Sequence, residues 1–425
     1  MNTKTVAIPA ATTAARTSPY ARLRQTPTML KAMLGTICAT TVLVMLIALG
    51  GVHSHRAGID TVGVKAASSI IAANKMVASM QDMDAQAASF LTGRPGANMQ
   101  AENDYDARRA VVGAALLDAS KNVTFGESVE KPIRALQDAL VRYEVTIAAA
   151  KDMHERGDEA FLASYRAARA IMENELKPAA AQLDKANQAI IEDVYAETSA
   201  SAWRWQLGLI AIGLITLGGL AYSQYFISQR MRRTISPALL AATVLSAVGV
   251  FYTCFAFHIE SSSLKTAKED AFANVHTLLS ARAVAFDAKG DESRWLLDRP
   301  LKDRYEQDFA SKSGQLSAVG ADAAKAYSAF VEVDKKVRAL ENSGQHAKAI
   351  SLGAGNDPGE ANWAFTQFDQ KVSATIDVNQ KKFDEAIASG FAATAGYDYV
   401  APGVAFLVVL LTFIGLRPRM KEYDI

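Results

Sequence analysis

Cysteines and catalytic signatures are scarce in this sequence of 425 residues. The only cysteines are Cys38 and Cys254, and both lie in apolar runs at predicted depths about 20 Å apart. Because a disulfide needs its two Cα atoms within roughly 7 Å, no intrachain bridge is expected. The chain also lacks a GxxxxGK[ST] phosphate-binding loop, an HExxH zinc motif and a G-x-S-x-G nucleophile motif. We therefore expect a protein that is not an enzyme and that binds no metal or cofactor.

Charged side chains are absent from four long runs of the sequence. These runs are Ala32–Val52, Leu207–Gln229, Thr234–Ile259 and Tyr399–Leu416. Each is long enough for a helix to cross a hydrocarbon layer of roughly 30 Å. The pattern predicts a polytopic membrane protein with spans at 32–52, 204–227, 235–258 and 399–416. Because intramembrane acids and bases are missing, an ion or proton pathway is not expected.

The formal net charge of +1 conceals a segregation of charge along the chain. Segment 53–203 contains 16 basic and 21 acidic residues, and segment 259–398 contains 17 and 21. The tail 1–31, the turn 228–234 and the tail 417–425 together contain 11 basic and only 2 acidic residues. Short basic segments favour the cytoplasmic side of a membrane. We therefore place both termini and the turn in the cytoplasm, and the two long segments outside. The tail 1–31 has no apolar period and is interpreted as an uncleaved, disordered segment.

Apolar residues after the first run follow a heptad-like spacing that predicts a long helix. They are Ile59, Val62, Ala66, Ala73, Met76, Met80, Met83, Ala87 and Phe90. The helix should end at Gly93–Gly96, because glycine and proline both interrupt helices. A second helix to about Lys121, a third from near Pro132 to Gly157, a short piece over 158–176 and a last helix from Pro178 into the second span should follow. Short connections of this kind predict an up-down four-helix bundle over 53–203.

The second half of the chain repeats the pattern of the first. Leu183–Gln188 resembles Ile376–Gln380, and each match lies at a similar distance before a predicted span. Gly157-x-x-Ala160 likewise matches Gly344-x-x-Ala347. Strand alternation is absent. The expected fold class is therefore all-α, with two extracytoplasmic up-down four-helix bundles at 53–203 and 259–398. Each bundle should be continuous with a pair of spans, so that the chain is an internal duplication.

Two short stretches carry a resemblance to known sensor families. Met80–Gly93, with the sequence MQDMDAQAASFLTG, and Asp291–Asp298, with the sequence DESRWLLD, resemble the end of the first helix in chemoreceptor-type four-helix sensor domains and CHASE3 domains. Those families continue into a cytoplasmic signalling module, whereas this chain re-enters the membrane after Arg233. The layout is similar to the four-span component of actinobacterial amino-acid sensing systems, whose partners are an outer binding lipoprotein and an inner kinase.

The resemblance implies a sensor of a bacterial inner membrane that has no output domain of its own. About 47 predicted cytoplasmic residues are fewer than the roughly 50 that a domain needs, so a separate cytoplasmic signalling protein is the expected output. An extracytoplasmic binding protein and a homo-oligomer are further expected partners, besides the lipid bilayer, and nucleic acid is not. The alternative interpretation is a structural scaffold, or an accessory subunit, of an envelope complex.

Three charged residues are candidates for ligand binding. Arg282 falls on the apolar stripe of its predicted helix, at the position that Met76 takes in the first repeat. A charge on an apolar seam is costly unless it is paired. Arg282 is therefore either an anion-binding residue, as the resemblance implies, or a guanidinium that reaches the surface beside a stripe shifted to Ala283. Asp84 and Arg294, near the tips of the two corresponding helices, are candidates of the same kind.

Overall fold

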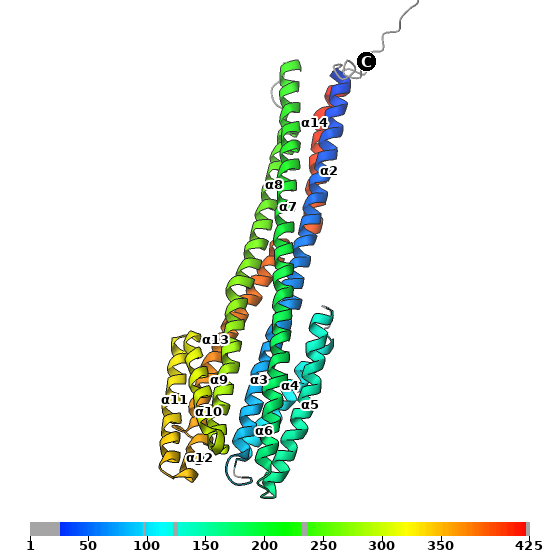
Figure 1. Ribbon diagram of the computed structural model, residues 1–425. Coiled ribbons are helices and arrows are strands. Elements are labelled where there is room, and N and C mark those ends of the chain that lie inside the picture. The colour runs from blue at the N-terminus through cyan, green and yellow to red at the C-terminus, as the bar shows by residue number, and fades with distance from the viewer. Residues whose placement is uncertain (1–25, 97, 122–125, 232–235, 422–425) are drawn as a thin grey trace, which may run out of the picture. The chain divides into compact units, whose positions relative to one another are not determined.

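The computed structural model describes residues 26–96, 98–121, 126–231 and 236–421. These residues form helices joined by short connections and contain no strand (Figure 1), which confirms the all-α fold class. Most of the predicted tail 1–31, residues 232–234 of the turn 228–234 and the last four residues lie outside the described residues. The chain divides into two compact units. The membrane unit contains residues 1–54, 201–258 and 393–425, and the extramembrane unit contains 55–200 and 259–392.

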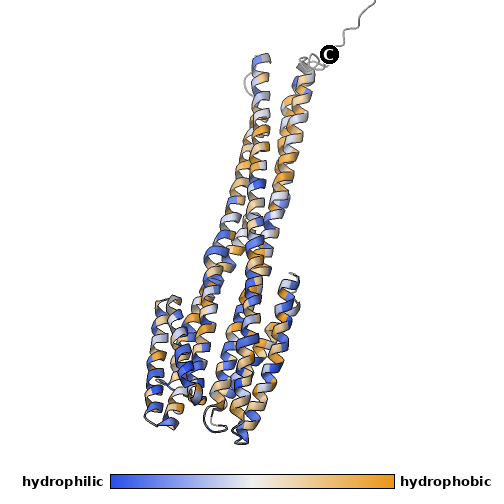
Figure 2. Cartoon of the chain, in the orientation of Figure 1, coloured by the Kyte–Doolittle hydropathy of each residue, from blue (hydrophilic) through white to orange (hydrophobic). Residues whose placement is uncertain are grey.

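Four helices of the membrane unit are long and apolar enough to cross a membrane. They belong to α2 (Thr26–Ile59), α7 (Lys177–Met231), α8 (Pro237–Lys265) and α14 (Tyr397–Lys421). Their apolar stretches stand out in the hydropathy colouring of Figure 2, whereas the shorter helices mix polar and apolar residues. By length and composition, the chain is therefore a multi-pass membrane protein.

Two apolar clusters show how the ends of the four spans are gathered within the membrane unit. One cluster contains Leu30 of α2, Ile227 of α7, Leu239 of α8 and Leu416 of α14. The other joins the opposite ends, and its buried members include Val52, Leu209, Phe257 and Tyr397. The beginnings of α2 and α8 thus lie at the same end of the unit as the final turns of α7 and α14.

The first helical group of the extramembrane unit packs around one apolar core. Its elements are η1 (Asp60–Ala66), α3 (Ala67–Leu91), α4 (Met99–Lys121), α5 (Glu127–Glu155), α6 (Phe161–Ile171), η2 (Met172–Leu176) and the first turns of α7. Met76, Met80 and Met83 of the predicted stripe are buried in this core. They meet Tyr143 of α5 and Tyr165 of α6 there, so the heptad spacing marks the packed face of α3.

The second helical group has a corresponding series of elements. They are η3 (Thr266–Phe272), α9 (Ala273–Leu297), η4 (Arg299–Leu301), α10 (Lys302–Gly314), η5 (Gln315–Ala318), α11 (Ala321–Asn342), α12 (His346–Ala354) and α13 (Ala361–Ala393). Its core is aromatic, and the ring of Phe365 contacts the rings of both Phe330 and Phe368. Ile70 and Ile71 of α3 belong to the same core, so the two groups are packed together.

The repeat is visible in the details of the backbone. In each half, a π-helical segment of seven residues precedes a helix of 25 residues: η1 precedes α3, and η3 precedes α9. In each half, too, a glycine with positive φ ends the third long helix, at Gly157 (φ 73°) and Gly344 (φ 81°). The residue after each glycine donates to a carbonyl five residues earlier, from Asp158 to Met153 and from Gln345 to Leu340. Both ends are Schellman motifs, which require a left-handed residue that glycine adopts readily.

One helix boundary differs from that predicted from the sequence, and another is confirmed within one residue. The third helix begins at Glu127 and not near Pro132, because Gly126 (φ 77°) ends the preceding connection and two acidic residues favour the helix start. The last helix of the first group, α7, begins at Lys177, one residue before the predicted Pro178. A π-helical segment, η2, leads into it without a break and ends at Leu176, two residues before Pro178. Such a segment changes the main-chain hydrogen-bond spacing, and the helix therefore continues through a proline that lacks an N–H.

Candidate functional site

Helices α3 and α9, the corresponding helices of the two repeats, pack against each other. Asp84 of α3 and Arg294 of α9 meet in this interface, and both side chains are fully buried. Nη2 of Arg294 donates to Asp84, and Nη1 donates to Asp291 at 2.5 Å and to Asp287 at 3.1 Å. Two of the residues singled out in the sequence are thus direct partners, although they lie 210 positions apart.

Gly290 makes room for the buried guanidinium. Arg294 folds back over the preceding turn of α9, and a Cβ atom at position 290 would overlap its terminal nitrogens. In the repeat, Gly290 corresponds to Asp84, because α3 and α9 have the same length and begin at corresponding residues. At this position of the repeat, α3 therefore contributes the Asp84 carboxylate, whereas α9 contributes the space at Gly290 that the Arg294 guanidinium fills.

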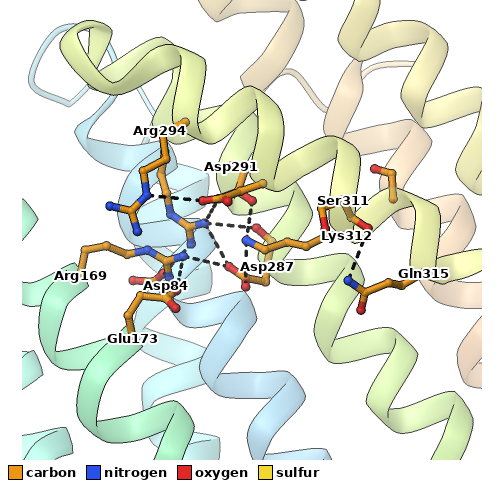
Figure 3. Close-up of polar contacts among 12 residues, drawn as sticks. Asp84, Arg169, Glu173, Asp287, Asp291, Arg294, Ser311, Lys312 and Gln315 are labelled. Carbon is orange, nitrogen blue, oxygen red and sulfur yellow. Dashed lines mark hydrogen bonds and ion pairs between the residues drawn. The ribbon is translucent and has the colours of Figure 1, made fainter.

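Three further cations reach the same carboxylates from neighbouring helices, and Figure 3 labels two of them, Arg169 and Lys312. Arg169 of α6 donates to Asp84 at 2.6 Å and to Asp287 at 3.2 Å. Lys177 of α7 lies 2.5 Å from Asp287, and Lys312 of α10 lies 3.0 Å from it. We call this set the charged cluster. Its members are Asp84, Arg169, Glu173, Lys177, Asp287, Asp291, Arg294 and Lys312. The four formal positive charges balance the four negative charges, as buried ionised groups require.

Neighbouring cations keep Asp84 and Asp287 of the charged cluster ionised. Burial by itself would raise the pKa of Asp84, but Arg294 and Arg169 lower this pKa below its usual value. Burial would also raise the pKa of Asp287. The nearby cations Arg169, Arg294 and Lys177 outweigh this effect and hold the pKa of Asp287 well below its usual range. Tyr143 donates its hydroxyl to Asp84 at 2.9 Å. Burial and this carboxylate raise the pKa of Tyr143 well above its usual value, so it remains a donor.

A cavity of about 380 Å³ lies between α6 and α10, beside the charged cluster. Arg169, Glu173 and Lys312 belong to both the cluster and the cavity wall. The other lining residues are Arg166, Ala170, Asn174, Leu301, Arg304, Tyr305 and Asp308. Four of the lining side chains are basic and two are acidic, and each basic side chain also pairs with at least one carboxylate.

The cations of the cavity wall differ in how firmly they are held. Arg166 forms a two-pronged pair with the buried Asp298, at 2.9 and 2.6 Å. Arg304, by contrast, is 70% exposed, and its Nε lies 3.7 Å from Asp308. Arg304 is therefore the most exposed and most loosely held of the four cations in the cavity wall.

Arg282, the third candidate from the sequence, lies apart from the charged cluster. Its Nε and Nη2 donate to the two carboxylate oxygens of Asp369 on α13, at 2.5 and 2.9 Å. Its guanidinium also lies 5.3 Å from the ring centre of Phe286. The charge on the apolar stripe is thus paired within the second helical group. A role for Arg282 in ligand binding stays a prediction.

Sequence reasoning missed most of the charged cluster. Asp287 and Asp291 stand one helical turn apart and share a face with Arg294, and this spacing was a usable signal. Arg169 and Lys177 lie in or next to the short segment 158–176, whose apolar spacing marks the packed face of a helix but not the distant partners of these cations. Asp287, which both cations contact, lies more than 100 positions away and is brought to them by the packing of α6 and α7 against α9.

A second buried polar group lies inside the second helical group. Lys289 of α9 pairs with Glu292 at 2.5 Å and also donates to the carbonyl of Gly353 at 3.2 Å. Arg338 of α11 donates to Asp334 at 2.7 Å, and its guanidinium lies over the ring of Trp295. Burial raises the pKa of Glu292 to about 7, although Lys289 opposes this shift.

Comparisons with known proteins identify a sensor-type segment in the first half. Residues 58–196 match the family model of the actinobacterial sensor domain. The match includes the whole first helical group, with Asp84, Arg169 and Lys177. No curated protein and no solved structure matches the chain. Together, the four apolar helices and the sensor-domain match indicate a multi-pass membrane protein of the sensor type.

Proposed function

We propose that this protein is a sensor of a bacterial inner membrane with both termini in the cytoplasm and the extramembrane unit on the opposite side. The basic charge of the predicted cytoplasmic segments supports this orientation. The orientation is also supported by the packing of the spans: the span ends that lead to these segments lie together at one end of the membrane unit. The extramembrane unit resembles chemoreceptor-type bundles, and the protein signals through a separate cytoplasmic partner without catalysis of its own. An outer binding protein and a second copy of the chain are further partners in this proposal.

The observation that carries the proposal is the sharing of three residues between the cavity and the charged cluster. Arg169 and Glu173 come from the first helical group, and Lys312 comes from the second. A bound ligand that draws Arg169 or Lys312 toward the cavity weakens their contacts with Asp84, Asp287 and Asp291. The two groups meet through these contacts, so ligand binding changes how α3 and α9 pack. A ligand shifts an equilibrium between two packing arrangements of α3 and α9 only if it binds one arrangement more tightly than the other.

The ligand class that fits the cavity is a small organic anion with two carboxylates. The lining offers Arg304 and Lys312 as cations, and Tyr305 and Asn174 as neutral hydrogen-bonding groups. Arginine recognises carboxylates through its planar pair of donors. A volume of about 380 Å³ lies within the range of small-molecule sites.

Calorimetry with the full-length protein in lipid nanodiscs tests this proposal. The probes are C4 to C6 dicarboxylates, and the uncharged diamides of the same chain lengths are the ligand controls. We expect at least one dicarboxylate to bind. Arg304→Gln should weaken binding about tenfold, as expected for the loss of one charge-assisted hydrogen bond. Arg109→Gln, outside the cavity, should have no effect. If no dicarboxylate binds, or if the diamide binds equally well, the anion-sensing proposal fails and the scaffold interpretation replaces it.

A further inference from the structure

The membrane unit contains a cavity of about 250 Å³ between all four helices. Ala48 of α2, Gly249 of α8, and Ala401 and Ala405 of α14 are among its lining residues, and their small side chains leave the space open. Val248 and Val400 also line the cavity and are 58% and 49% exposed, so its mouth lies between α8 and α14, on a surface that faces lipid. The walls are overwhelmingly apolar.

Two hydroxyl groups in this cavity stand out from the others in the spans. Thr216, Ser223 and Thr412 each donate to the carbonyl oxygen four residues earlier, at 2.7 to 2.9 Å. Thr41 and Ser246 do not, and among the described residues neither hydroxyl has a hydrogen-bond partner. Both residues are at least nine-tenths buried, at 6% and 9% exposure, and both line the cavity. A hydroxyl without a partner in an apolar interior is costly, so these two predict a polar atom inside the cavity.

The depth of the two hydroxyls narrows the class of ligand. Thr41 lies near the middle of the charge-free run 32–52, and Ser246 near the middle of 234–259. At 1.5 Å per residue, both are about 14–18 Å from the ends of their spans. The polar headgroup region of a phospholipid begins at the edge of the hydrocarbon layer, about 15 Å from its centre. Acyl chains that reach the cavity therefore contribute only CH₂ and CH₃ groups, which cannot accept a hydrogen bond.

We propose that this cavity binds a lipophilic molecule that carries a carbonyl group, with the carbonyl oxygen held by the hydroxyls of Thr41 and Ser246. A carbonyl oxygen has two lone pairs and can accept from both hydroxyls at once. A ketone or quinone ring system is compact and apolar apart from this oxygen, and it partitions into the bilayer interior. The site is independent of the cavity between α6 and α10, and it gives the membrane unit an input of its own.

Photolabelling with benzophenone tests this site, because benzophenone is a lipophilic ketone that crosslinks to nearby C–H bonds on illumination. The full-length protein is labelled in lipid nanodiscs, and the labelled peptides are identified by mass spectrometry. Fluorenone and fluorene, which differ only in the carbonyl group, serve as competitors. We expect labelling at Gly249 or Val404, two of the lining residues. Fluorenone should suppress this labelling at lower concentration than fluorene does.

The matched variants preserve shape and remove one hydroxyl at a time. Thr41→Val and Ser246→Ala should each reduce the suppression by fluorenone about fivefold, the effect of roughly one lost hydrogen bond. Thr216→Val is the control, because Thr216 also lines the cavity but its hydroxyl donates to Ile212. Equal suppression by fluorene and fluorenone would overturn the carbonyl site, and so would labelling spread evenly over the lipid-facing residues. Loss of suppression in all three variants alike would also overturn it.

Discussion

Removal of the Asp84 side chain should strongly destabilise the extramembrane unit. Its carboxylate is fully buried and accepts hydrogen bonds from Arg169, Arg294 and Tyr143. Asp84→Ala leaves the charged cluster with four cations and three anions, without water to screen the difference. Removal of one partner from a buried ion pair costs about 3–5 kcal/mol. For a unit of this size, the loss should lower Tm by roughly 10 °C.

Thermal unfolding of the full-length protein in nanodiscs, followed by far-UV circular dichroism, measures this effect. Asp106→Ala is the control, because Asp106 is exposed on α4 and pairs with Arg109 only at 3.5 Å. An exposed pair of this kind contributes less than about 1 kcal/mol. If the two substitutions lower Tm equally, Asp84 is not held in a buried network and the reasoning fails.

A double substitution separates the charge effect from packing. Asp84→Leu with Arg294→Met removes one anion and one cation, so the charges that remain in the cluster are balanced again. The double variant should therefore be more stable than either single variant, since buried pairs can often be replaced by apolar residues at little cost. If the losses of the two single variants simply add in the double variant, the two side chains act independently. That result would contradict the direct contact between them.

Three further predictions concern other parts of the extramembrane unit. Gly290→Ala should destabilise the protein by about 1–3 kcal/mol in the same thermal assay, because its Cβ would displace the buried guanidinium. Gly113→Ala is the control, because no atom lies within 4 Å of the new Cβ, and it should be neutral or stabilising. A similar loss of stability in Gly290→Ala and Gly113→Ala would refute the steric argument. Because the pKa of Glu292 is raised from 4.5 to about 7, the folded state binds this proton more tightly than the unfolded state. The free energy of unfolding should therefore fall as pH rises from 4.5 to about 7. In a pH series, Glu292→Gln should flatten this slope. An unchanged slope in the variant would contradict the role of Glu292. Arg282→Leu should destabilise the protein by about 1–2 kcal/mol, because it leaves Asp369 unpaired. Adding Asp369→Leu should restore most of this loss. A single variant as stable as the wild type would show that the pair does not contribute to stability.

The helices could be predicted from the sequence because their signals are local. The stripe that includes Met76 and Met80 is the buried face of α3, and glycines mark the ends of α3 and α5. Proline misled at position 132, because Pro132 lies inside α5, whose tertiary packing outweighs the local preference. Pro178 marked the start of α7 within one residue.

The pairing of charges could not be predicted in the same way. Asp84 and Arg294 could be singled out because each is a charge near the tip of one of the two corresponding helices, but their partnership depends on the packing of α3 against α9. Arg282 shows the same limit, because the partner that neutralises it, Asp369, is 87 residues away on another helix. A single sequence contains no information on which distant carboxylate meets a given guanidinium.

The most direct test of the account is whether an anion in the cavity changes the packing of the two helical groups. Spin labels attached to cysteines at Ala135 of α5 and Lys335 of α11 report the distance between the groups, after Cys38 and Cys254 are replaced by serine. The distance distribution is measured by electron paramagnetic resonance in nanodiscs, with and without saturating dicarboxylate. The account predicts a shifted distribution in the wild-type background, and the same shift in Arg304→Gln only at about tenfold higher dicarboxylate concentration. A distribution that stays unchanged while calorimetry shows the dicarboxylate bound would contradict the coupling of the cavity to the charged cluster.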